Sequence, residues 1–519
     1  MRFTLRTTAF TLAITGAIAA GAYGTASFIV SEDVPDAAEE FFAAWSGGDL
    51  DKASKLTTDP HAALLALKAY KNHVPTTSVD FAAHDVQGQH VPFTVTAHVS
   101  AQDAAGSWAY ESQLDVRDEP REGERVVWKP SVIHPELAGR TGYTLKAVTT
   151  APETAVLSRE GTALDKQDHP GLSQVIDQLK KRLAAQAGAP ALSIRLTPQF
   201  SDGESTTVAH VVEGKPGTIR TTIDPALQQV AEAAVAEHPG ASVVAVQPST
   251  GEVLTVATSA NGELNPALEG VEAPGSVFEI VTAAALLEQG AVSPTTATPC
   301  PDQATVAGTA FTNPELKNGG AGGTFADAFA ASCDTAFVRL ADELAPGALA
   351  KEAKEVFGLG LNWQAGITTS DGAVPRLTGA DRAAAAVGRG EVRLNVLNLA
   401  SITATVRSGA FKQPRLVAAD MAGVDQAQAE RPLSGTVARQ LRALMNHHAS
   451  RGTGAPAMSG SDAAFGSMAG LAERGTGHAA QGWFTAFDGD IAVASAVSAR
   501  GEGVAHAGAV SRAVLDAGN

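Results

Sequence analysis

Two pairs of candidate strands stand at opposite ends of the C-terminal part of this chain. The first, ASVVAVQPSTGEVLTVATS at residues 241–259, has two apolar runs around a Pro-Ser-Thr-Gly turn. The second, WFTAFDGDIAVASAVS at residues 483–498, has two runs around Asp488-Gly489, a strong hairpin signal. Helical patterns fill most of the stretch between them. The layout predicts one antiparallel sheet built from both ends of a domain, residues 221–519, with flanking helices.

The preceding part of the chain divides into two predicted regions. Two helices broken at Gly47-Gly48 come first, and three strand-like segments follow, at residues 91–100, 107–116 and 124–133. Helices followed by antiparallel strands predict a small α+β domain over residues 32–140. Residues 141–220 hold one helix and two short strands, and we expect them to form a linking domain.

The N-terminus carries a long uncharged stretch. Arg2 and Arg6 precede it, it runs from Thr7 to Ser31, and two acidic residues follow. This length can cross a bilayer, and the positive flank favours a cytoplasmic start. We therefore expect residues 1–31 to form a single-pass membrane anchor with the rest of the chain outside the cytoplasm. A cleaved signal peptide is the alternative, because small residues could form a cleavage site.

The composition excludes one class of partner. The formal net charge is −17, and the sequence has no stripe rich in Lys and Arg. Nucleic acid is therefore not expected as a partner, because neutralising phosphates requires clustered cations.

The chain resembles class B penicillin-binding proteins over nearly its whole length. The residues that carry the resemblance are NPALEGVEAPGSVFEIVTAAALLEQG (265–290), FADAFAASCDTAFVRLA (325–341) and the first strand pair with the helix before it. VVWKPSVIHPELAGRTGY (126–143) is similar to the end of the N-terminal domain of the methicillin-resistance type, which has the cone-shaped fold of nuclear transport factor 2. The resemblance implies an anchor, a cone-shaped domain, a linking domain and a transpeptidase domain, in that order.

The family cross-links peptidoglycan through a serine that forms an acyl-enzyme with a peptide ending in D-Ala-D-Ala. Its motifs are Ser-x-x-Lys, Ser-x-Asn and Lys-Thr-Gly. The first falls on Ser276-Val277-Phe278-Glu279, with glutamate in place of lysine. Glu279 could act as a base, but it cannot stabilise an alkoxide electrostatically. Ser-x-x-Glu at a helix start is also a capping box, and we favour that interpretation over a working nucleophile.

The second and third motifs are altered as well. The second falls on Ser332-Cys333-Asp334, where aspartate replaces asparagine and removes an amide donor. The alternative is that Ser332 and Asp334 cap the next helix. The third aligns with Met468-Ala469-Gly470, which lacks the cation and hydroxyl that hold the substrate carboxylate. A less favoured register, Arg474-Gly475-Thr476, restores a cation.

Together the substitutions lower the formal charge of the site by about four units relative to the family pattern. A substrate or β-lactam carboxylate would be repelled, at about 4 kcal/mol for each like-charge pair 4 Å apart. One of the two carboxylates could take up a proton, and Arg474 or His478 could supply a cation. We expect a catalytically inactive homologue that acts as a scaffold or ligand-binding partner in cell-wall synthesis. The alternatives are an active D,D-transpeptidase acylated on Ser276, and a binding module that works through the cone-shaped domain.

Cofactors and partners follow from the same analysis. No cofactor and no metal site is expected, because no His or Cys cluster has ligand spacing, although Glu279 and Asp334 form a weak candidate for a cation. The expected partners are cell-wall synthesis proteins, with a peptidoglycan stem peptide or β-lactam as ligand. Cys300 and Cys333 are the only cysteines. In an exported chain they form a candidate disulfide, and two buried thiols are the alternative.

Overall fold

The chain forms two compact units that each draw on separate stretches of sequence. The computed structural model describes residues 34–200, 203–259, 264–314, 316, 323–418, 421, 425–460, 465–473, 479–499 and 501–518. The first unit comprises residues up to Ala151 and Pro190–Lys215, and the second comprises Pro152–Ala189 and Pro216 onward. The predicted anchor, residues 1–31, lies outside the described residues. No helix of the described part is both long and apolar enough to cross a membrane.

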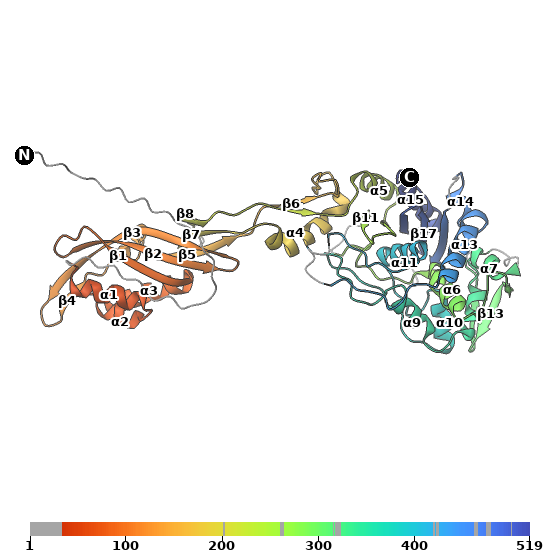
Figure 1. Ribbon diagram of the computed structural model, residues 1–519, viewed down its shortest axis with the longest axis horizontal. Coiled ribbons are helices and arrows are strands. Elements are labelled where there is room, and N and C mark those ends of the chain that lie inside the picture. Colours follow the sequence, from red (N-terminus) through yellow and green to blue (C-terminus); the bar gives the residue numbers. More distant parts are fainter. Residues whose placement is uncertain are drawn as a thin grey trace, which may run out of the picture. The chain divides into compact units, whose positions relative to one another are not determined.

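The first unit packs three helices against a four-stranded antiparallel sheet of order β1-β2-β3-β4 (Figure 1). Its elements are α1 (Asp36–Ser46), α2 (Leu50–Lys55), α3 (Pro60–His73), β1 (Thr76–Ala83), β2 (His90–Ala101), β3 (Ala104–Glu119) and β4 (Gly123–Val126). The break at Gly47-Gly48 separates α1 from α2, as predicted. The third predicted strand is shorter than expected, because the chain turns into a 3-10 helix at Pro130, whose nitrogen cannot donate to a sheet.

Aromatic side chains hold α1 on this sheet. Phe42 lies 4.7 Å from Phe93 and 4.9 Å from Phe81, measured between ring centroids, and Trp45 lies 4.9 Å from Phe81. All four side chains are buried. Burial of such rings removes a large apolar area from water, so this cluster stabilises the packing of α1 on the sheet.

The predicted linking domain at residues 141–220 is not a separate unit. Its outer strands β5 (Tyr143–Thr150), β7 (Ala191–Pro198) and β8 (Thr206–Val212) form an antiparallel sheet that belongs to the first unit. Its remaining elements, β6 (Thr154–Leu157), α4 (Ser173–Ala187) and β9 (Gly217–Arg220), belong to the second. The reason lies in the packing: Leu145, Leu192 and Ile194 join the apolar core of the first unit, whereas Val156 and Leu179 join that of the second.

The second unit contains the sheet that the two distant strand pairs predict. Its strand order is β11-β10-β18-β17-β16, and all neighbours are antiparallel. The strands are β10 (Ala241–Val246), β11 (Val253–Thr258), β16 (Gly466–Ala472), β17 (Gln481–Asp488) and β18 (Ile491–Ser498). The first pair therefore meets the second between β10 and β18, and β16 lies at an edge.

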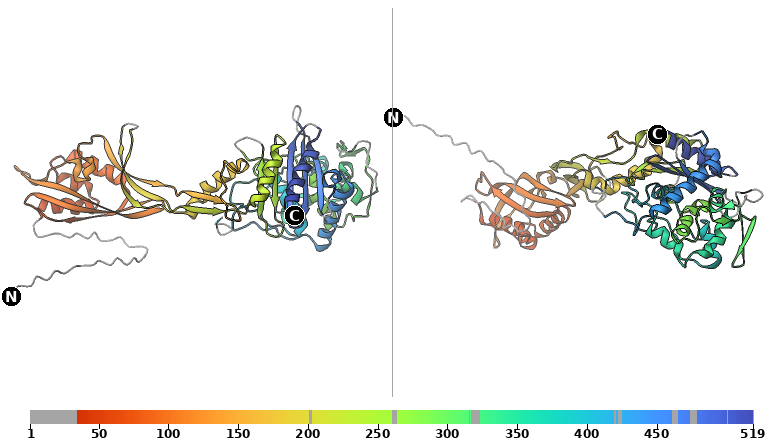
Figure 2. Two further views of the ribbon diagram at one scale, coloured as in Figure 1. Left: turned by 90° about the horizontal axis from the view of Figure 1, so that it is seen from above. Right: turned by 45° about the vertical axis from the view of Figure 1, so that its right-hand side comes forward.

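Helices cover both faces of this sheet (Figures 1 and 2). On one face lie α5 (Pro225–Ala236) and α15 (Gly503–Ala517), and on the other lie α11 (Val396–Ser408), α6 (Glu279–Glu288) and α13 (Gly435–Arg451). Every residue of β10 is buried, as a strand covered on both faces requires. Further α-helices in the described part of this unit are α7 (Phe325–Ala330), α8 (Asp334–Leu340), α9 (Ala348–Glu355), α10 (Gly379–Ala386) and α14 (Ala455–Met458).

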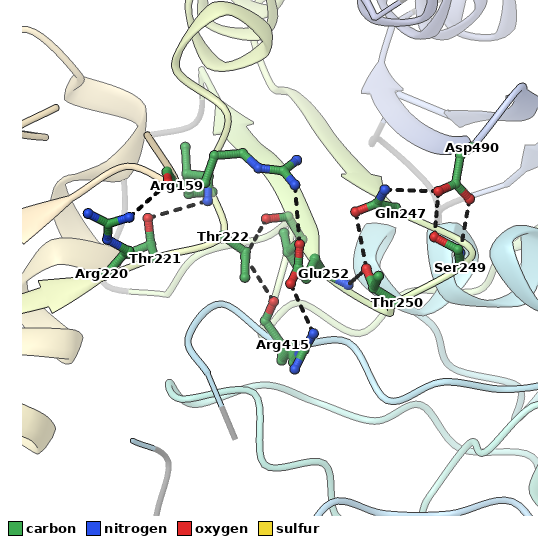
Figure 3. Close-up of polar contacts among 12 residues, drawn as sticks. Arg159, Arg220, Thr221, Thr222, Gln247, Ser249, Thr250, Glu252, Arg415 and Asp490 are labelled. Atoms are coloured by element: carbon green, nitrogen blue, oxygen red, sulfur yellow. Dashed lines mark hydrogen bonds and ion pairs between the residues drawn. The ribbon is translucent and has the colours of Figure 1, made fainter. Parts of the chain in front are cut away.

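A polar junction ties the β6–β9 strand pair to the main sheet (Figure 3). Glu252, just before β11, accepts hydrogen bonds from Arg415 at 2.9 Å and Arg159 at 3.4 Å. Thr222, just after β9, donates to the carbonyl oxygen of Val253 at 2.7 Å. Because β6 and β9 are parallel, and Arg159 follows β6 while Thr222 follows β9, these bonds fix the C-terminal end of the strand pair to the edge strand β11.

We predict that Glu252→Ala loosens this junction. The side chain of Glu252 is 23% exposed, and removing it leaves two arginines without their carboxylate. The free energy of opening of β11, measured by native-state hydrogen exchange, should fall by about 1–2 kcal/mol. Glu122→Ala is the control, because Glu122 is 70% exposed and only approaches Arg125 at 3.8 Å. Equal effects of the two variants would contradict the role of the junction.

Candidate active site

Ser276 lies in a short 3-10 helix, η4 (Gly275–Phe278), that leads into α6. Gly275 precedes it with φ +65°, and a Cβ there would lie 2.5 Å from the carbonyl oxygen of Leu471. Glycine is therefore required twice over, by the backbone conformation and by the contact with β16. The side chain of Ser276 is buried, with 1% of its surface exposed.

The predicted capping box at Ser276 and Glu279 is not formed. Ser276 is already part of the 3-10 helix, α6 begins at Glu279, and its cap residue Phe278 makes no side-chain capping bond. A cap residue needs a non-helical backbone, which this position lacks. The hydroxyl of Ser276 instead donates to Oδ1 of Asp334 at 2.8 Å. The first and second motifs are therefore joined directly.

The second motif lies in the turn between α7 and α8. Ser332 has a positive φ of 49°, and its hydroxyl lies 3.1 Å from that of Thr453. Asp334 is the first residue of α8 and is fully buried. The predicted capping of α8 by these side chains is wrong, because the cap residue is Cys333 and it makes no side-chain capping bond. Asp334 faces Ser276 rather than its own helix.

Arg389 supplies a cation that the motif positions lack. It follows α10, between two glycines of positive φ, and its guanidinium forms an ion pair with Oδ2 of Asp334. The adjacent glycine, Gly388, accepts a hydrogen bond from the amide of Gly275 at 3.0 Å, which places the turn of Arg389 beside η4. Sequence reasoning missed this residue, and the only signal was a single arginine in the Gly-Arg-Gly turn.

Burial dominates the electrostatics of Asp334. It raises the pKa of Asp334, against the opposing effects of the Arg389 charge and of hydrogen bonds with Ser276 and Glu279. Glu279 is fully buried too. A hydrogen bond between two carboxyl groups requires a proton on one of them. With Arg389 paired to Asp334, the site is less negative than the motif substitutions alone predict.

The third motif lies on β16, against the turn that carries Ser276. Met468 and Ala469 are fully buried, and a Cβ on Gly470 would come within 2.6 Å of the amide nitrogen of Val277 and 3.0 Å of that of Ser276. The absence of a side chain at Gly470 therefore allows β16 to contact η4 directly. The favoured register places the glycine of the third motif at this position. The alternative register, Arg474-Gly475-Thr476, and His478 lie outside the described residues.

A buried histidine connects the second motif to β16. His448 of α13 is fully buried; its Nδ1 lies 2.9 Å from the hydroxyl of Ser467 and its Nε2 lies 2.9 Å from that of Thr453. The amide of Ala469 also donates to Nε2 at 3.3 Å. Because an amide N–H only donates, Nε2 is the acceptor and Nδ1 carries the proton. Burial lowers the pKa of His448 to about 3, so the imidazole is neutral at physiological pH. No sequence motif marked this residue.

The two cysteines form a disulfide, with a Cα–Cα distance of 6.0 Å. The bond ties the second motif at Cys333 to the loop that holds Cys300. Asn313 reinforces the same junction, because its side chain donates to the carbonyl of Pro301 at 2.9 Å and accepts from the amide of Thr335. Within the described ranges, no group of three or more His, Cys, Asp or Glu side chains could hold a metal ion.

Ser276, Ser332 and Gly470 thus lie together at β16, the edge strand of the five-stranded antiparallel sheet. A family model described as the penicillin binding protein transpeptidase domain matches residues 241–516, more than half of the chain. A second, described as an NTF2-like N-terminal transpeptidase domain, matches residues 34–141. The chain belongs to the class B penicillin-binding proteins.

Individual relatives agree with this assignment. The peptidoglycan D,D-transpeptidase PbpA of Mycolicibacterium smegmatis is 30% identical over 280 residues, which are 44% of this chain and 55% of PbpA. The chain thus spans about half of that relative. Penicillin-binding protein A of Mycobacterium tuberculosis, solved as a ceftriaxone acyl-enzyme complex, matches with 25% identity and a TM-score of 0.51 over 58% of this chain and 80% of its own. PBP2 of Pseudomonas aeruginosa, at 22% identity, shows the shared fold with a TM-score of 0.55 over 71% and 96% of the two chains.

We predict that His448 makes this unit sensitive to acid. Its pKa in the folded protein, about 3, lies below the ordinary value of 6.5, so the unfolded chain binds the proton first as pH falls. The contribution of neutral His448 to the free energy of unfolding is fully present above pH 6.5. Below that pH it falls by about 1.4 kcal/mol per pH unit, down to about pH 3. In urea denaturation, the stability advantage of the wild type over His448→Gln should shrink by that slope between pH 6.5 and pH 5. His61→Gln is the control, because His61 is exposed to water; a constant advantage would contradict the prediction.

We further predict that Gly470→Ala destabilises the site. The new methyl group would meet backbone nitrogen atoms, which cannot rotate away as a side chain can. Thermal unfolding should show a loss of about 1–3 kcal/mol. Gly435→Ala in α13 is the matched control, because its nearest neighbour is the end of Arg439 at 3.7 Å, and it should be neutral or slightly stabilising. An unchanged melting temperature for Gly470→Ala would mean that β16 does not press on η4.

Proposed function

We propose that this protein acts in peptidoglycan synthesis as a penicillin-binding-protein homologue that binds ligand or partner proteins without forming an acyl-enzyme. The observation that carries the proposal is the buried chain of contacts from Ser276 to Asp334 to Arg389. In this arrangement the serine hydroxyl is a donor to an ion-paired carboxylate rather than a nucleophile beside a free ammonium group.

Two physical arguments support this proposal. First, nucleophilic attack requires the reacting atoms to approach to about 3–3.5 Å, and a hydroxyl with 1% exposure does not meet a substrate carbonyl without movement of the surrounding chain. Second, Arg389 neutralises Asp334 and so weakens it as a proton acceptor, while fully buried Glu279 and Met468 supply no positive charge for the developing oxyanion.

The location and the partners form part of the same proposal. The uncharged stretch from Thr7 to Ser31 would anchor the chain in the cell membrane, with both units outside the cytoplasm. The partners would be other proteins of cell-wall synthesis, and the ligand would be a peptidoglycan stem peptide or a β-lactam. Membership of the class B family supports this placement.

One observation favours an active D,D-transpeptidase as the second candidate. The 2.8 Å hydrogen bond from Ser276 to Asp334 has the geometry of a nucleophile and its general base, with Arg389 as the group that orients the base. The raised pKa of Asp334 moves this carboxyl toward the range of a useful base. In this candidate, Asp334 rather than Glu279 removes the proton.

We predict that a fluorescent penicillin does not label the full-length protein covalently. M. smegmatis PbpA, the D,D-transpeptidase relative, serves as the positive control for the probe. Ser276→Ala is the matched variant, and a label on the wild type that disappears in this variant would replace our proposal with the active enzyme. If such a label appears, a loss of 10²-fold or more in labelling rate for Asp334→Asn would identify Asp334 as the base.

A further inference from the structure

Arg389 is the member of the buried contact chain that meets solvent. Its side chain is 31% exposed, whereas that of Asp334 is 0% exposed. Ser276 and Glu279 are buried, as are the third-motif residues Met468 and Ala469. A ligand that enters this site therefore meets a guanidinium first and the acidic side chains only afterwards.

We propose that Arg389 receives the carboxylate of a ligand and releases Asp334 in exchange. This inference rests on the proposed function, because it names the ligand chemistry of that same site. A guanidinium binds a carboxylate through two parallel N–H donors, so an incoming carboxylate can compete directly for the group that holds Asp334. Arg389 thereby takes over the anion-binding role that the residues of the third motif cannot perform.

The exchange has a consequence for protons. One ion pair breaks and one forms, which leaves Asp334 buried without its cation. The groups that face Asp334 are the hydroxyl of Ser276 from η4, the carboxyl of Glu279 from α6 and Arg389 from the turn after α10. Without the guanidinium, a buried carboxylate beside a second carboxyl group favours its neutral form. Binding of one ligand carboxylate is therefore accompanied by uptake of about one proton from solvent.

The test compares two small peptides that differ only at the carboxylate. N-acetyl-D-alanyl-D-alanine and its C-terminal amide are titrated by calorimetry into the full-length protein at pH 6 and pH 8, in buffers of different ionisation enthalpy. The acid should bind at least tenfold more tightly than the amide, with proton uptake and with weaker binding at pH 8. Arg389→Gln should remove the preference for the acid, and Arg389→Lys should restore part of it.

A second variant keeps the test independent of folding. Asp334→Asn removes the competitor for Arg389, so it should bind the acid more tightly than the wild type and without proton uptake. Loss of folding would change affinity in the opposite direction. Arg382→Gln is the control, because this arginine lies on neighbouring α10 and pairs with Asp342 instead; it should leave both affinities unchanged.

The outcomes separate the two proposals. Equal binding of acid and amide, unchanged by Arg389→Gln, would overturn the role of Arg389 while leaving ligand binding intact. Absence of binding of either peptide to the wild type and to Asp334→Asn would overturn the inference and the ligand-binding function together. Covalent labelling by penicillin bears only on whether Ser276 reacts.

Discussion

Three glycine contacts bring the parts of the site together, and the remaining geometry depends on them. Gly275 touches Leu471 of β16, Gly470 touches the amides of η4, and Gly388 lies against the carbonyl of Gly275. No residue with a side chain fits these positions without displacement of backbone. The contacts hold an edge strand, a helical turn and the Arg389 loop within van der Waals distance, so side chains from distant motifs meet in a buried interior.

In that interior, the positive charge comes from a residue outside the family motifs, because the motif positions no longer carry a lysine. The lysine position of the first motif holds Glu279, the asparagine position of the second holds Asp334, and the cation comes from Arg389 outside all three motifs. A buried carboxylate without a counter-ion costs several kcal/mol, so buried Asp334 depends on its ion pair with Arg389. The same arginine is the solvent-exposed member of the contact chain that reaches Ser276 through Asp334.

Local patterns in the sequence predicted the framework better than the site. The two hairpins, the helix that begins at Pro225 and the break after Ser46 follow from turn chemistry and periodicity, which act over a few residues. The capping prediction at Ser276 failed because the local Ser-x-x-Glu pattern does not show which partner the serine hydroxyl binds. In the folded protein that hydroxyl donates to Asp334, which is distant in sequence. Sequence patterns could not identify Arg389 and His448, because their roles arise only from tertiary contacts.

The pairing of β10 with β18 has a consequence for folding during synthesis. Strand β10 has β11 on one side from the start, but its other edge stays open until the ribosome has made β16, β17 and β18 near the opposite end of the unit. Contacts of such large sequence separation form slowly and leave apolar strand edges exposed in the interval. The unfinished chain is therefore prone to aggregation until this sheet closes, and loss of β18 would leave β10 with an unpaired edge.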